Sequence, residues 1–172
     1  SILPHVSVII VDYNSGDKLR ACLSCLQTQS FKSFDVIIVN NGNPNYTEEN
    51  FKAYELDLKI LSPDKNLGFA KANNEAVKVA RGEWLAFLNP DAYPEAGWLD
   101  ALMTATKKYP DVKAFGSTQI MAADSTRLDG AGDVYHILGI PYRGYFGWPT
   151  DTLPKEGEVF AACAAAALYE TN

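Results

Sequence analysis

Asp91 is the residue whose type and position point most directly to chemistry. It follows a short apolar run at 84–88, bounded by Gly82 and Pro90, which is typical of a strand buried on both faces. Ligands of open α/β sheets bind outside the carboxyl ends of the strands, so Asp91 stands where a site is expected. A carboxylate there can bind a hard divalent cation, and the cation can bind a diphosphate. Because Asn, Pro and Asp are also common turn residues, the segment 89–91 is equally compatible with a simple turn.

Polar or aromatic residues follow three predicted strands, at 12–14, 40–42 and 89–91. The carboxyl ends of parallel strands lie at one edge of a sheet, so these segments are expected to meet there. Tyr13 offers a face to a flat base, and the asparagines offer donors and acceptors to the edge of the base. The segment 66–68 precedes a predicted helix whose free N–H groups favour an anion such as phosphate. Together these groups are complementary to a nucleoside diphosphate with its metal ion.

Each of these residues also has an ordinary structural explanation, and the absence of two known motifs argues against two classes of enzyme. Tyr13 can be a capping aromatic, Asn40 and Asn41 can form a turn, and Gly68 can be a backbone hinge. No G-x-G-x-x-G follows the first strand and no P-loop motif occurs, which argues against a Rossmann dehydrogenase and a P-loop NTPase. His5 and His136 are isolated, and we expect both to be structural or solvent-exposed.

The three cysteines are Cys22, Cys25 and Cys163. The first two form a C-x-x-C, which is compatible with a redox pair or half of a zinc site. Cys22 falls on the apolar face of a predicted helix, however, and no second Cys or His pair follows at metal-ligand spacing. We therefore expect small, buried or partly buried thiols in a reducing compartment.

The composition is that of an ordinary globular protein. The 172 residues are 47% hydrophobic and 21% charged, which suits a single domain with a sizeable core. The net charge is -6 and no block of Lys or Arg occurs, which argues against a nucleic-acid binder and a polybasic membrane anchor. No apolar run approaches the ~20 residues that span a bilayer, and no signal-peptide pattern opens the chain, so we expect a soluble protein.

Strands and helices are predicted to alternate four times between Val6 and Gly116. This alternation is typical of an α/β fold with a mostly parallel open sheet and helices on both faces. The predicted strands cover 6–11, 36–39, 56–60, 84–88 and 112–116. Two helices are predicted to begin after caps at Ser15 and Thr47. A third is predicted over 69–81, with Gly82 as its C-cap and with Phe69, Ala72, Ala76 and Ala80 facing the core. A fourth is predicted from Pro94 to Lys108, with Trp98, Leu102 and Ala105 facing the core.

The alternation stops after Gly116. We expect short strands at 118–122 and 125–128, a long aromatic segment at 130–157 that is functional or mobile, and a last buried strand at 159–168. The chain is therefore predicted to be one domain, with a strand-helix core at 1–116 and a less regular region at 117–172.

Five ordered motifs, spread over most of positions 6–168, resemble glycosyltransferase family 2. The resembling branch is that of the rhamnosyltransferase-like enzymes of bacterial surface polysaccharides. The motifs are V-S-V-I-I-V-D-Y-N at 6–14, V-N-N-G at 39–42, N-L-G-F-A-K-A-N-N at 66–74, A-R-G-E-W-L-A-F-L-N-P-D at 80–91 and G-W-L at 97–99.

The resemblance implies a GT-A fold, a nucleotide-diphosphate sugar donor, Mg²⁺ or Mn²⁺, and transfer with inversion at the anomeric carbon. It implies that Asp91 is the metal ligand of an Asp-x-Asp-type motif, whose first acid is replaced here by Asn89. It also implies the donor-binding residues, which are Val11 and Tyr13 in the nucleobase pocket, Asn40 at the base edge, Gly68 and Asn74 along the donor, and Asn89.

Asn40 and Asn89 each replace an acid of the family pattern, and the catalytic base of the family would lie beyond the last residue of this chain. The base is needed because an alcohol is a poor nucleophile until a carboxylate accepts its proton. Asp129 and Asp133 are candidate substitutes, but we expect both to be loop residues. The resemblance thus implies a single family 2 domain, with a nucleotide-binding core at 1–116 and an incomplete acceptor-side region at 117–172. The chain is accordingly expected to be a fragment that binds donor without efficient catalysis.

The resemblance leads us to expect a glycosyltransferase of cell-surface polysaccharide synthesis. We expect a UDP- or dTDP-sugar donor, a glycan or lipid-linked hydroxyl acceptor, and no nucleic acid. We also expect a cytoplasmic location, with peripheral association of the full-length protein at the inner face of the cell membrane. The alternatives are a non-catalytic nucleotide-binding scaffold and a sugar nucleotidyltransferase, which uses a similar sheet edge and metal.

Overall fold

The computed structural model describes residues 3–42, 46–131, 133–135, 141–143, 146–152 and 165–171. Its α-helices are α1 (Asp17–Gln27), α2 (Phe69–Val79) and α3 (Trp98–Lys108), and its short 3₁₀ helices are η1 (Glu48–Phe51) and η2 (Thr150–Thr152). Its strands are β1 (Val6–Asp12), β2 (Phe34–Asn40), β3 (Leu58–Leu61), β4 (Trp84–Leu88), β5 (Ala114–Gly116), β6 (Gln119–Met121), β7 (Asp124–Gly130), β8 (Asp133–Tyr135), β9 (Pro141–Arg143) and β10 (Ala166–Glu170).

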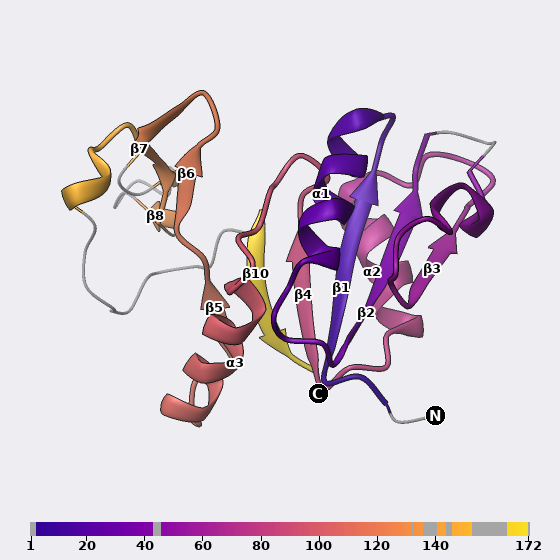
Figure 1. Cartoon of the computed structure of the whole chain (residues 1–172), viewed down its shortest axis with the longest axis horizontal. Coiled ribbons are helices and arrows are strands. Elements are labelled where there is room, and N and C mark those ends of the chain that lie inside the picture. Colours follow the sequence, from indigo (N-terminus) through magenta and orange to yellow (C-terminus); the bar gives the residue numbers. More distant parts are fainter. Residues whose placement is uncertain are drawn as a thin grey trace.

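Six of these strands form one sheet in the order β3-β2-β1-β4-β10-β5 (Figure 1). β1 pairs in parallel with both β2 and β4, and β2 pairs in parallel with β3. β10 runs antiparallel to β4 and β5. The prediction of a mostly parallel sheet is therefore confirmed, and β3 lies at its edge, as the alternation of Leu58 and Ile60 with charged residues predicted.

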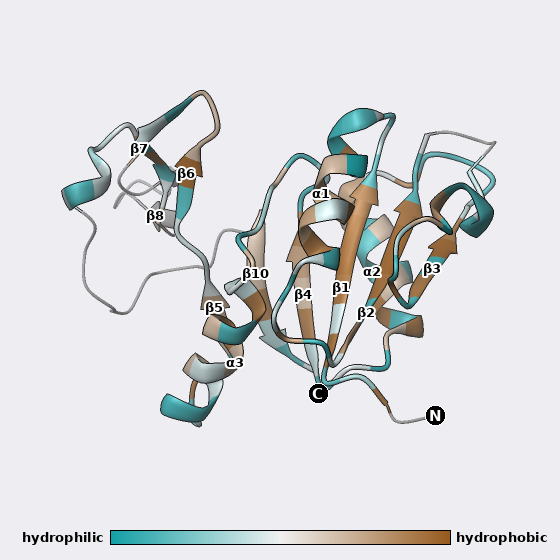
Figure 2. Ribbon diagram, in the orientation of Figure 1, coloured by the Kyte–Doolittle hydropathy of each residue, from teal (hydrophilic) through white to brown (hydrophobic). Residues whose placement is uncertain are grey.

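Helices cover both faces of the sheet, also as predicted. Side chains of α1 and α3 pack with Val8, Ile10 and Ile38 on one face, whereas Ala72 and Ala76 of α2 pack on the other. Successive strand residues point to opposite faces, so a strand buried on both faces is apolar throughout. Figure 2 shows this as brown along most of β1 and β2, whose few polar residues lie near the strand ends.

Two details of the predicted helix at 69–81 are wrong. Phe69 is 54% exposed instead of inward, because the first turn of α2 extends beyond the sheet. The helix ends at Val79, so Gly82 is not its C-cap. Gly82 instead packs against the backbone of β1, where a Cβ would lie 2.5 Å from the nitrogen of Ser7. Glycine is required there by the close approach of two backbones.

The predicted cap of α1 is also wrong. Gly16, with φ +56°, precedes the helix, and Ser15 donates its backbone N–H to Asp12 Oδ1 at 3.2 Å. Glycine adopts a positive φ without strain, which explains the helix start. The prediction for Thr47 is confirmed in part, because its N–H donates to Asn50 Oδ1 at 2.8 Å where η1 begins.

The helix predicted from Pro94 begins only at Trp98. The carbonyl oxygens that a longer helix would use accept other hydrogen bonds. Buried Gln29 donates from Nε2 to the oxygen of Glu95 at 2.7 Å, and its Oε1 accepts from the N–H of Leu99 at 3.0 Å. Gln29 thus fixes the segment between β4 and α3 to the end of α1. In α3 itself, Leu102 is buried as predicted, whereas Trp98 and Ala105 are only partly buried.

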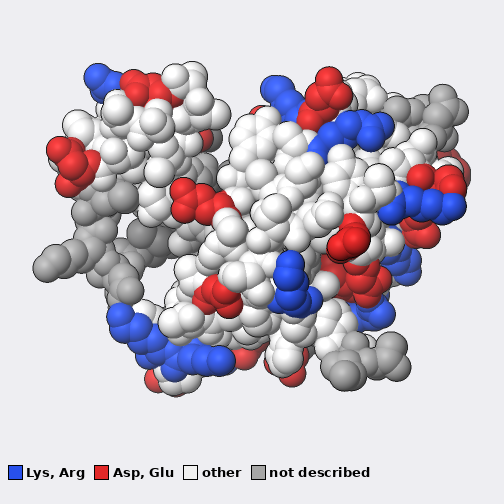
Figure 3. All heavy atoms as spheres, in the orientation of Figure 1, with Lys and Arg blue, Asp and Glu red and all other residues white. Residues whose placement is uncertain are grey.

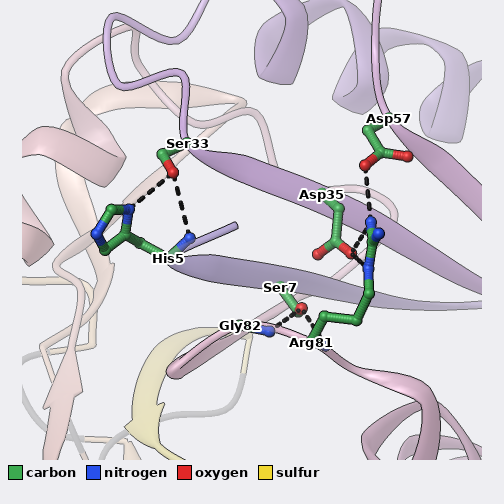
Figure 4. Close-up of polar contacts among 7 residues, drawn as sticks. All are labelled: His5, Ser7, Ser33, Asp35, Asp57, Arg81 and Gly82. Carbon is green, nitrogen blue, oxygen red and sulfur yellow. Dashed lines mark hydrogen bonds and ion pairs between the residues drawn. The ribbon is translucent and has the colours of Figure 1, made fainter. Parts of the chain in front are cut away.

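The end of the sheet away from Asp91 is held together by polar contacts (Figure 4). Arg81 Nη2 lies 2.9 Å from Asp35 Oδ2 and 2.7 Å from Asp57 Oδ2, so one guanidinium joins the starts of β2 and β3. Ser7 Oγ accepts from the backbone N–H groups of Arg81 and Gly82, at 3.2 and 3.0 Å. These bonds fix the start of β4 against β1.

The remaining strands form two small sheets. β6 and β7 pair in the predicted hairpin, which lies apart from the six-stranded sheet in Figure 1, and β8 pairs with β9. Asp129 and Asp133 lie in β7 and β8, so the expectation that they are loop residues is wrong. Residues 153–164 and most of 136–145 are outside the described residues, and with them parts of the predicted 130–157 segment and last strand.

The surface carries both signs of charge. Lys and Arg side chains are interspersed with Asp and Glu on the face shown in Figure 3. Within the described residues, no helix has the length and apolar character that crossing a bilayer requires. His5 is exposed and its Nδ1 lies 2.7 Å from Ser33 Oγ, which fits the expected structural role, whereas His136 is outside the described residues.

Cys22 and Cys25 are free thiols in the structure. Cys22 is fully buried on the sheet side of α1, and Cys25 is partly buried, as predicted for both. Burial, with smaller contributions from Cys25 and Asp91, raises the pKa of the Cys22 thiol to about 12. Cys163 lies outside the described residues.

Replacing Ser7 by alanine should lower the free energy of unfolding by about 1–3 kcal/mol, because it leaves the buried N–H of Gly82 without an acceptor. Urea denaturation measures the change. Ser24→Ala is the control, since that exposed hydroxyl bonds only within α1, and it should change the stability by less than about 0.5 kcal/mol. Equal effects of the two substitutions would contradict the assigned role of Ser7.

Cys22 should resist alkylation in the folded protein. With a pKa of about 12, only about 1 in 10,000 of the Cys22 thiols is ionised at pH 8, and burial blocks access to the reagent. Iodoacetamide labelling followed by peptide mass spectrometry should modify the partly exposed Cys25 first and Cys22 only after denaturation. Labelling of both at one rate, or a Cys22–Cys25 disulfide under mild oxidant, would favour the redox-pair alternative.

Candidate functional site

A cleft of about 590 Å³ lies where the order of the strands reverses, between β1 and β4. The chain leaves β1 toward β2 on one side and reaches β4 on the other, so no connection covers the gap between them. α1 borders the cleft from one face of the sheet and α2 from the other. The lining residues are Val11, Tyr13, Asn14, Ser15, Lys18, Phe69, Asn89, Pro90 and Asp91.

Asp91 is exposed and lines this cleft. It stands directly after β4 in a turn closed by the N–H of Ala92, which donates to the oxygen of Asn89 at 3.1 Å. The N–H of Asn89 in turn donates to the oxygen of Ala165 at 2.9 Å, next to β10. The turn and the site are thus not alternatives, since the turn holds the carboxylate in the cleft.

Tyr13 forms an aromatic wall of the cleft and is 62% exposed. Its ring packs on Gly42 at the end of β2, where an added Cβ would lie 2.7 Å from Tyr13 Cδ2. The preceding residue, Asp12, is fully buried and accepts the N–H of Ser15, which closes the turn that carries Tyr13. The Tyr13 ring thus lies between a turn fixed by buried Asp12 and the exposed Gly42 just beyond β2.

A second tyrosine lies behind this turn. Burial, reinforced by the neighbouring carboxylate of Asp12, raises the pKa of Tyr46 to about 12. Like that of any tyrosine, its hydroxyl is protonated at neutral pH, and here it can donate to a buried carboxylate. This contact belongs to the support of the turn, because neither Tyr46 nor Asp12 lines the cleft.

Four of the residues expected at the site line one cleft, namely Val11, Tyr13, Asn89 and Asp91. They come from strands that are more than 70 positions apart in the sequence, and the pairing of β1 with β4 brings them together.

Asn40, Gly68 and Asn74 do not line this cleft. Asn40 is 4% exposed, pairs in register with Asp12, and accepts the N–H of Gly42 on Oδ1 at 3.4 Å. By the alternation along β2, its side chain points to the α1 face. Gly68 and Asn74 are exposed, at the start and the middle of α2.

Sequence reasoning missed Lys18 and Phe69 as cleft residues. Both lie in the first turn of a helix that begins where the sheet ends. Phe69 fits the apolar spacing of its helix, and this spacing predicts a core position. A first-turn position after a strand end was the available signal, since such residues extend beyond the sheet.

The polar groups at the β4 end fit a hard divalent cation. The carboxylate of Asp91 and the amide oxygen of Asn89 are oxygen ligands of the kind that Mg²⁺ and Mn²⁺ prefer. In the part of the chain that the structure describes, no group of three or more His, Cys, Asp or Glu gathers around one point. A cation here would therefore take most of its ligands from the bound molecule and water.

Comparison with known proteins gives one family. The model of the Glycosyl transferase family 2 matches residues 7–166. Glycosyltransferase AglE of Haloferax volcanii is 33% identical over 105 residues, which cover 58% of this chain and 34% of AglE. The putative teichuronic acid biosynthesis glycosyltransferase TuaG of Bacillus subtilis is 29% identical over 129 residues, which cover 73% of this chain and 51% of TuaG. The chain thus spans about a third of AglE and half of TuaG.

Solved structures give the same fold. The S. aureus protein TarS, crystallised with UDP-GlcNAc, superposes with a TM-score of 0.60 and 26% identity, over 67% of this chain and 34% of that chain. GalNAc-T7, solved with UDP, GalNAc and Mn²⁺, superposes with a TM-score of 0.75 and 15% identity, over 98% of this chain and 35% of that chain. These glycosyltransferases have the GT-A fold, which confirms the predicted fold class. Because the family model covers nearly the whole chain, the protein belongs to glycosyltransferase family 2.

Proposed function

We propose that this chain binds the nucleotide-sugar donor of an inverting, metal-dependent glycosyltransferase. The observation that carries the proposal is the meeting of Tyr13 and Asp91 in one open cleft at the β1–β4 switch point. An exposed aromatic face suits a nucleobase, and an exposed carboxylate suits a cation that holds a diphosphate. Both ends of a nucleoside diphosphate therefore have a matching group.

Each residue of the site has a role in this proposal. Tyr13 stacks on the base above Val11, and Asp91 with Asn89 supplies protein ligands to Mg²⁺ or Mn²⁺. The cation, when bound, neutralises charge on the diphosphate leaving group. Asn40, Gly68 and Asn74 are assigned to the donor only by the family resemblance, because they lie outside the cleft as the structure forms it.

The transfer step needs a base that this cleft does not supply. The acceptor oxygen attacks the anomeric carbon from the side opposite the diphosphate, and a base takes its proton. Asp91 is the carboxylate among the residues that line the cleft. In the proposal it is a metal ligand, so it is not available as the base. The base therefore comes from outside the cleft, and we expect the isolated chain to bind donor without efficient transfer.

Relatives support the substrate class. TarS was solved with UDP-GlcNAc and GalNAc-T7 with UDP and Mn²⁺, and TuaG is described as an enzyme of teichuronic acid biosynthesis. We propose a UDP- or dTDP-sugar donor and a glycan or lipid-linked acceptor in cell-surface polysaccharide synthesis, with a rhamnosyltransferase-like activity. The proposed place of action of the full-length protein is the cytoplasmic face of the cell membrane.

Calorimetry with UDP, dTDP and GDP, each with and without Mn²⁺ or Mg²⁺, tests donor binding. Metal should strengthen nucleotide binding, and Asp91→Ala should remove that gain, about 10- to 100-fold in affinity, because one charged ligand is lost. Asp111→Ala, at an exposed position outside the cleft, is the control and should bind as the wild type does. Binding of no nucleotide would favour the scaffold, and pyrophosphate release from a sugar phosphate and a nucleoside triphosphate would favour a nucleotidyltransferase.

Gly42→Ala tests the aromatic wall without touching the metal end. Its Cβ would meet the Tyr13 ring at 2.7 Å, and the ring, being exposed and flexible, should turn away at little cost in stability. Nucleotide affinity should fall about as much as in Tyr13→Ala, about 10-fold, because stacking is lost in both. Gly97→Ala is the control, because nothing lies within 4 Å of its Cβ position. Unchanged affinity in Gly42→Ala and Tyr13→Ala would exclude stacking on this ring.

A further inference from the structure

Lys18 brings a positive charge into the cleft that contains Asp91. It lies in the first turn of α1 and is exposed. The charged residues among the cleft lining are Lys18 and Asp91. The ion pairs found among the described residues involve neither of them, so the ammonium group is available to a ligand of the cleft.

The position of Lys18 differs from that of the other lysine near the cleft. Lys71 lies in the first turn of α2, one position further into its helix than Lys18 is into α1, and it is also exposed. Lys71 does not line the cleft, where α2 contributes the ring of Phe69 instead. The cleft therefore has a cation on its α1 side, an aromatic ring on its α2 side and a carboxylate at the β4 end.

We propose that Lys18 is a donor-binding residue whose ammonium group binds the diphosphate, an inference that rests on the proposed function. A nucleotide sugar carries two negative charges on its diphosphate, and Asp91 adds one. A divalent cation supplies two positive charges, which leaves one negative charge uncompensated. Lys18 supplies the missing positive charge, and an ammonium group binds phosphate well as a compact point charge.

The need for this charge grows during transfer. When the bond between the anomeric carbon and the diphosphate breaks, its electron pair stays on the phosphate oxygen. The acceptor oxygen forms the new bond to carbon, and its proton goes to the base that the proposed function requires. The leaving nucleoside diphosphate thus carries one more negative charge than the donor did. Lys18 stabilises the negative charge that develops on the diphosphate in the transition state more than the smaller charge of the bound donor. Such a difference lowers the barrier to transfer.

Calorimetry with UDP, UMP and uridine in the presence of Mn²⁺ tests the role of Lys18, with the thymidine or guanosine series in its place if the wild type binds that base. Lys18→Gln should weaken binding of the diphosphate about 10- to 100-fold and of the monophosphate less, and should leave the nucleoside unchanged. Lys18→Arg should retain most of the affinity. The loss in Lys18→Gln should shrink as salt is raised, because the contact is ionic.

Lys71→Gln is the matched control, since it changes the net charge equally from the first turn of α2, the helix on the other face of the sheet. It should bind all three probes as the wild type does, and circular dichroism should show every variant folded because both lysines are exposed. If Lys18→Gln bound the diphosphate as tightly as the wild type, or if Lys71→Gln lost as much affinity, only the proposed role of Lys18 would be overturned. Absence of nucleotide binding by the wild type would overturn the proposed function itself.

Discussion

The parallel pairing of β1 with β4 is the constraint on which the cleft depends. These strands are neighbours in the sheet but not in the chain, and their connections run to opposite sides. A parallel strand needs a crossover on one face, so α1 and α2 take opposite faces and leave the gap above β1 and β4 open. The apolar side chains that bury the sheet thereby also bring Tyr13 and Asp91 within one cleft.

Buried polar side chains convert that rough placement into a defined one. Gln29 holds the segment after Asp91 through Glu95 and Leu99, and Asn41 Oδ1 accepts the N–H of Leu67 at 2.8 Å just before α2. Each of these groups is almost fully buried, so leaving its partner unpaired would cost free energy. The loops around the cleft are therefore held by hydrogen bonds to buried side chains, while their exposed side chains stay available to a ligand.

The sequence was sufficient for the parts that follow from local pattern. Continuous apolar runs identified β1, β2 and β4, and their polar ends located the edge at which Tyr13 and Asp91 meet. Close approaches were not predictable, because nothing local distinguishes Gly82, packed on the β1 backbone, from a helix C-cap. Helical spacing also could not show that Phe69 lies outside the core. The spacing tells which side of the helix a residue faces, but not whether the sheet still covers the helix at that residue. The roles of Asn40, Gly68 and Asn74 remain predictions.

The single carboxylate of the cleft has a consequence for how metal and donor would bind. Asn89 stands where a second acid would add charge, so the protein alone offers a divalent cation one negative ligand and one neutral oxygen. Such a set holds a cation weakly, because affinity for hard cations rises with the charge of the ligands. In the proposed function a diphosphate would add two charged groups to the same cation, so metal and nucleotide would strengthen each other's binding equally. Lys18, across the cleft, repels a lone cation and attracts the diphosphate, which favours their arrival together over metal binding first.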